Sequence, residues 1–76
     1  MTLETFEEIY SQPRYTVNDL VNEMIEIADL YADAKCHIVK AQNYLEIAYY
    51  HEKASDMFKR LRWLADKIKE KIANGD

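Results

Sequence analysis

Residues 16–50 carry the pattern that most constrains the fold, an apolar repeat of period 3.5 in a segment without glycine or proline. From Val17, apolar residues recur alternately three and four positions apart. Such a repeat forms one seam along a helix and is typical of helices that pack side by side with a left-handed supercoil. The seam consists of Val17, Leu20, Met24, Ile27, Tyr31, Ala34, Ile38, Ala41, Leu45 and Ala48. The sequence therefore predicts a long helix over residues 17–50.

The rest of the chain also favours helices, because Gly75 and Pro13 are its only glycine and proline. A sheet needs turn residues between its strands, and few are present. We therefore expect an all-α fold that forms a single helical domain over residues 1–76. Pro13 predicts the end of a short N-terminal helix at residues 2–11, followed by a turn at residues 11–15.

Two paths of the chain after residue 50 fit the sequence. The apolar set changes frame near residues 51–55, which favours a turn there and a second helix over residues 56–73, folded back as a helical hairpin. The alternative is one continuous helix over residues 17–73, because a second apolar stripe of the long helix continues into the last segment without interruption.

This second stripe lies on another side of the long helix from the seam. A helix at the surface of a protein needs one apolar face, so two stripes indicate a helix that is covered from two directions. A chain of 76 residues buries little surface by itself, and we expect a second subunit to supply one cover. The sequence thus predicts a coiled-coil-like homo-oligomer, a dimer or larger. The stripe consists of Ile25, Ala32, Cys36, Val39, Ile47 and Tyr50.

Small and aromatic residues suggest where the subunits meet. From Tyr31 onward, every second seam position is an alanine, which lets a neighbouring helix approach closely. Tyrosine combines apolar area with a hydrogen-bonding tip, which suits subunit boundaries. The expected oligomer interface consists of Tyr31, Ala34, Ile38, Ala41, Tyr44, Leu45, Ala48 and Tyr49.

Charge is unevenly distributed along the chain, whose formal net charge is −4. Residues 1–33 carry eight acids and one base, whereas residues 53–72 carry seven bases and three acids. The two halves can pair within a hairpin or between antiparallel subunits. The last helix can instead present a basic face to a partner protein or to nucleic acid. That face consists of Lys59, Arg60, Arg62, Trp63 and Lys67, and the nucleic-acid interpretation also includes Lys69.

Trp63 has a further interpretation, in which its ring packs against the N-terminal helix.

Cys36 is the only cysteine, which excludes an intrachain disulfide and favours a reducing, cytoplasmic location. Its apolar neighbours predict a buried structural thiol. For His37 and His51, ordinary hydrogen bonds are favoured over a metal site between subunits.

Motifs that carry catalysis are missing from the sequence. No Ser–His–Asp arrangement, glycine-rich phosphate loop or zinc-ligand spacing occurs. No apolar run approaches the length of a membrane span. We therefore expect no enzyme activity, no cofactor, no metal ion and no membrane partner.

The run LYADAK at residues 30–35 and the Arg62-Trp63 pair resemble small helical proteins of bacteriophages. The resemblance covers about a tenth of the chain and implies a small phage or mobile-element protein that acts by binding. We expect a non-enzymatic, homo-oligomeric interaction module that binds or modulates a partner protein. The alternatives are a nucleic-acid-binding protein that uses the basic last helix, and a protein that sequesters a nucleotide at the oligomer interface.

Overall fold

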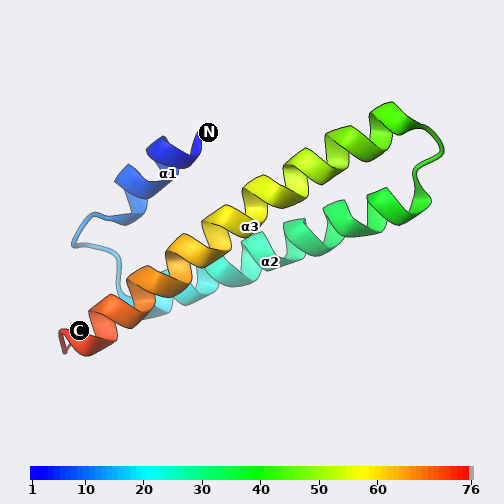
Figure 1. Cartoon of the computed structure of the whole chain (residues 1–76). Helices are drawn as coiled ribbons and strands as arrows, with labels where there is room; N and C mark the ends of the chain where they lie inside the picture. Colours follow the sequence, from blue (N-terminus) through cyan, green and yellow to red (C-terminus); the bar gives the residue numbers. More distant parts are fainter. Residues whose placement is uncertain (76) are drawn as a thin grey trace.

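The computed structural model describes residues 1–75, which form three helices (Figure 1). Helix α1 spans Leu3–Tyr10, α2 spans Val17–Lys40 and α3 spans Tyr44–Ala73. Helices α2 and α3 form a long antiparallel hairpin, and α1 packs against α3 toward the open end of the hairpin. The expected all-α class and the hairpin are confirmed for this part of the chain.

The turn of the hairpin lies at residues 41–43 and not at the expected residues 51–55. Residues 51–55 belong to the interior of α3. The predicted helices over residues 17–50 and 56–73 are therefore wrong in their bounds, and the alternative continuous helix over residues 17–73 does not form either. The hairpin instead has arms of 24 and 30 residues.

Hydrogen bonds of the capping residues explain the position of the turn. Ala41 has an extended backbone and ends α2. The side-chain oxygen of Asn43 accepts a hydrogen bond of 2.9 Å from the backbone N–H of Glu46, and the Glu46 carboxylate accepts one of 3.4 Å from the N–H of Gln42. An Asn followed three residues later by Glu is a signature of a helix start. This signature is present in the sequence, but the heptad repeat runs across it.

The start of α2 is fixed by the same kind of capping. The Thr16 hydroxyl accepts a hydrogen bond of 3.2 Å from the N–H of Asp19, whose carboxylate accepts one of 2.9 Å from the N–H of Thr16. This reciprocal pair satisfies two backbone N–H groups that a helix start would leave without partners. The segment between Ser11 and Thr16, with Pro13 inside it, connects this start to α1.

The core lies in the half of the hairpin that α1 covers. Phe6 of α1 is buried between the two long helices, together with Leu20 and Ile27 of α2 and Leu64 of α3. Burying a side chain of this size stabilises a fold by about 1.5–3 kcal/mol. Phe6 therefore anchors the short α1 on the hairpin.

The predicted heptad seam is used within the chain along α2. Leu20, Ile27 and Ala34 are buried against α3. Beyond the turn the seam loses its cover, and Leu45 is 79% exposed. A heptad describes one straight helix, so its second half points elsewhere once the chain reverses direction.

Candidate interaction surfaces

The expected oligomer interface is divided between the interior of the hairpin and its tip. Ala34 is buried, and Tyr31, Ile38 and Ala41 are half-buried, because this side of α2 faces α3 of the same chain. The remaining members, Tyr44, Leu45, Ala48 and Tyr49, are exposed near the turn. The eight residues do not form one surface, and an interface role stays a prediction for the four exposed ones.

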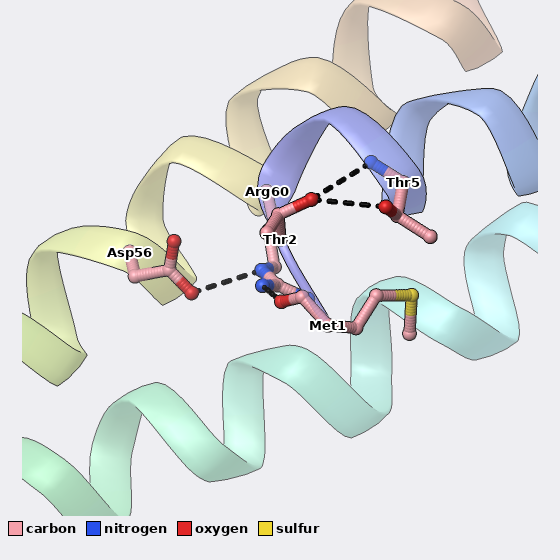
Figure 2. A network of polar contacts seen from close by, with 5 residues as sticks. All are labelled: Met1, Thr2, Thr5, Asp56 and Arg60. Atoms are coloured by element: carbon pink, nitrogen blue, oxygen red, sulfur yellow. Dashed lines mark hydrogen bonds and ion pairs between the residues drawn. The ribbon is translucent and has the colours of Figure 1, made fainter.

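Arg60, predicted on an exposed basic face, is buried where α1 begins. Its guanidinium donates a hydrogen bond to the backbone carbonyl of Met1 and forms a 3.0 Å ion pair with Asp56 (Figure 2). The same guanidinium lies 5.1 Å from the ring centroid of Phe6. Because these contacts occupy two of its nitrogens and one face of its plane, and because the residue is buried, Arg60 holds α1 in place and is not presented to a partner.

Trp63 follows the interpretation in which it packs against the N-terminal helix. Its ring meets that of Phe6 edge-on, with 5.9 Å between the ring centroids, and it borders the buried core. The ammonium group of Lys67 lies 6.0 Å from the Trp63 ring centroid and forms a 3.9 Å ion pair with Glu70. An aromatic ring held in this way has less area left for stacking on a base.

The predicted basic face is therefore not one surface. Arg60, Trp63 and Lys67 lie on the side of α3 that α1 covers, whereas Lys59 and Arg62 are exposed on other sides of the helix. The cause is the angular spacing of about 100° per residue, which places neighbours in sequence on different sides of a helix.

Acidic side chains of α2 line the edge of the surface that α1 covers. Tyr10 bonds through its side chain to Glu23, and Tyr15 lies beside Tyr10 with 4.9 Å between the ring centroids. Partial burial of the phenol, together with the hydrogen bond to the Glu23 carboxylate and its charge, raises the pKa of Tyr10 to about 12. All three causes favour the neutral phenol over the phenolate.

Beyond α1, the same side of the hairpin carries a groove between α2 and α3, with a volume of about 390 Å³. Here the His37 ring stacks on Tyr50 at a centroid distance of 4.6 Å, and Tyr49 meets Tyr50 edge-on at 5.0 Å. The Lys53 ammonium group lies 5.2 Å from the Tyr49 ring centroid. His37 Nδ1 is 2.8 Å from the carbonyl oxygen of Asp33. This tip groove is aromatic, partly exposed and close to the turn.

The opposite side of the hairpin has no cover among residues 1–75, and we call it the open face. A shallower groove on this side, lined by Tyr31, Lys35 and Phe58, shows that it spans both long helices. The Tyr31 and Phe58 rings lie 6.2 Å apart there. The apolar residues of the open face are Val21, Ile25, Ala28, Ala32 and Val39 of α2, and Ile47, Phe58, Ala65 and Ile72 of α3, all exposed.

Part of the open face was predicted as the second apolar stripe, which named Ile25, Ala32, Val39 and Ile47. The prediction missed Val21 and Ala28, although they continue the spacing of three and four residues on either side of Ile25. Phe58 belongs to the apolar set of the predicted last helix and not to that stripe, and the residue is 48% exposed. The seven-residue spacing of Phe58, Ala65 and Ile72 is the signal that identifies them as one line.

Cys36, expected to be a buried thiol, is exposed. Ala32, Val39 and Ile47 of the stripe to which it belongs lie exposed on the open face and do not cover it, whereas Tyr50 of the same stripe lies in the tip groove. Within residues 1–75 no three His, Cys, Asp or Glu side chains are placed to hold a metal ion. No helix in this part of the chain is long and apolar enough to cross a membrane.

No protein-family model, no curated protein and no solved structure matches the chain.

Proposed function

We propose that this chain is a non-enzymatic, cytoplasmic helical interaction module that associates with copies of itself and binds or modulates a partner protein. The observation that carries the proposal is the open face of the hairpin. There Ile25 is 57%, Val39 85% and Ile72 61% exposed to solvent. Contiguous apolar patches larger than a few hundred Å² are rare on monomeric proteins and mark interaction sites.

Self-association offers this face the burial that the described chain lacks. The buried core of residues 1–75 is small and contains Phe6, Leu20, Ile27 and Leu64. Small domains are marginally stable on their own, and oligomerisation is a common way to bury further apolar area. The open face supplies that area without any change in the hairpin itself.

A different surface remains for the partner protein. The tip groove lies on the opposite side of the hairpin and presents Tyr49, Tyr50 and His37, with Tyr44 exposed nearby. Tyrosine is enriched among residues that dominate protein–protein binding energies. An assembly through the open face thus leaves the tip groove of each subunit available. The resemblance to small phage proteins agrees with such a binding role and assigns no residue to it.

Light scattering coupled to size-exclusion chromatography tests the proposal directly. We expect the measured mass to be a multiple of the 9.0 kDa chain mass at micromolar concentrations and to fall toward 9.0 kDa on dilution. A stable, folded monomer throughout that range would contradict self-association and, with it, the proposed function.

A further inference from the structure

We propose that the open face binds a second copy of this chain in one particular arrangement. The two hairpins point in the same direction and are related by a two-fold axis parallel to their length. Helix α2 of each subunit then packs on α3 of the other, which makes a four-helix bundle in which all neighbouring helices are antiparallel. The inference rests on the proposed function, which requires self-association but not this pairing.

The size of the open face suits a dimer. The described chain measures 48 by 19 by 15 Å along its principal axes. A face that runs the length of the hairpin therefore offers roughly 700–900 Å², close to the ~800 Å² that each partner buries in a standard interface. A short peptide would leave most of this length uncovered, whereas a second hairpin matches it.

The spacing of the apolar residues suits helix-on-helix packing. On α2, Val21, Ile25, Ala28 and Ala32 are separated alternately by four and three residues. Lys35 occupies the next position of this repeat, and Val39 the one after it. This is a second heptad, parallel to the one that packs α2 against its own α3, and a heptad seam receives side chains of a facing helix between its own.

Heights along the hairpin determine which residues would meet. Tyr31 lies beside Phe58, and His37 lies beside Tyr50, so residue numbers at the same height on α2 and α3 add up to 87–89. A two-fold axis parallel to the hairpin keeps every height unchanged. A residue of α2 therefore faces the residue of the partner's α3 whose number, added to its own, gives 87–89.

Side-chain sizes are complementary in this arrangement. Phe58 of the partner subunit comes level with the interval between Ala28 and Ala32, and Ala65 of the partner subunit comes level with the interval between Val21 and Ile25. Phe58 thus lies opposite two small side chains, and the small Ala65 lies opposite two larger ones. If the hairpins pointed in opposite directions about the same midpoint, Ala28 would face Ala32 and Phe58 would face its own copy. That pairing would leave unfilled space between the two alanines and would crowd the two phenylalanine rings. Both defects destabilise a packed interface.

Charge favours the same arrangement. Asp29 lies one helical turn from Ile25 on α2, and Arg62 lies one turn from Phe58 on α3. Neither side chain forms an ion pair within residues 1–75. With α2 packed on the partner's α3, Asp29 comes within about one helical turn in height of Arg62 of the partner subunit, whereas with the opposite orientation the acidic half of α2 would face a second α2. Exposed pairs are weak, so charge here selects orientation more than it adds affinity.

Disulfide cross-linking tests the pairing. In a Cys36→Ser background, one chain carries Ala32→Cys and another Phe58→Cys, and the two are mixed, unfolded, refolded together and oxidised. We expect a covalent dimer in the mixture and little from either variant alone. Both substitutions are at exposed positions, and circular dichroism checks that the helices are retained.

The outcomes separate the inference from the proposed function. Efficient cross-linking of Phe58→Cys alone would overturn the arrangement in favour of hairpins that point in opposite directions. If light scattering shows an oligomer but no mixture of open-face variants cross-links, the open face is not the interface and self-association survives. A monomer in light scattering overturns both.

Discussion

The two sides of the α2–α3 hairpin differ in cover, although the same two helices build them. On one side α1 lies over the core, with Phe6 buried and Arg60 bonded to the first residue of the chain. On the other side, apolar residues at heptad spacing face solvent. In both places the apolar pattern follows the helical repeat, so the pattern alone does not reveal which face is already occupied.

This difference shows how a short chain distributes its apolar surface. A single α1 of 8 residues covers part of one face and leaves the tip groove beside it. The open face has an equally regular apolar seam and no cover from residues 1–75. Exposing a face of this kind costs free energy that a second subunit would recover, whereas the α1 side is completed within the chain.

The largest expected effect on stability comes from removing the contact that holds α1 on the hairpin. Phe6→Ala removes the side chain that anchors α1, and we expect a loss of about 3–5 kcal/mol in unfolding free energy, as for other buried Phe→Ala changes. Urea denaturation followed by circular dichroism measures it. Phe58→Ala, which truncates an exposed ring of the same type, is the matched control.

For Phe58→Ala we expect a loss below about 1 kcal/mol at protein concentrations where any dimer is dissociated, because exposed positions contribute little. Equal losses for the two variants would show that the faces do not differ in the way the structure describes.

A smaller effect is expected from a charge placed on the open face. Ile25→Lys brings a cation to the apolar seam, and we expect the dimer dissociation constant to rise at least tenfold, about 1.4 kcal/mol. Leu30→Lys is the matched control, because Leu30 and Ile25 lie on the same helix, are each 57% exposed, and point about 140° apart. A dilution series in light scattering gives both constants.

Leu30 borders the tip groove, so Leu30→Lys should leave the dissociation constant within about twofold of the unsubstituted chain. The open face would lose its assigned role if Leu30→Lys weakened the dimer as much as Ile25→Lys does.

The smallest expected effect is a pH dependence confined to the α1 side. The pKa of Tyr10 is raised from 10.0 to about 12 in the folded chain, so the unfolded chain loses this proton first as pH rises. The contribution of Tyr10 to stability is therefore fully present below pH 10 and is lost as pH rises through 12. Ultraviolet titration of the phenols, compared with Tyr10→Phe, measures the late-titrating group.

Tyr10→Phe should remove that late titration and flatten the dependence of stability on pH in this range. Persistence of the late titration in Tyr10→Phe would assign it to another tyrosine.

The helical class and the use of Leu20, Ile27 and Ala34 as a packing surface could be predicted, because they follow from the periodicity of side chains on a helix. The exposed stripe was also visible in part, through Ile25 and Val39. The turn was misplaced. The capping signature at Asn43 is worth only about 1 kcal/mol, and the uninterrupted heptad repeat across it predicts a continuous helix.

Periodicity is a local property, so the sequence by itself determined that the chain forms helices with two apolar faces. The tertiary structure decided which of these faces the chain covers by itself. It placed α1 over Arg60 and Trp63, which a basic segment had suggested were exposed, and it left Leu45, beyond the turn, exposed. The physical reason is that burial depends on where the chain reverses direction, and a reversal at residues 41–43 reassigns every apolar side chain beyond it.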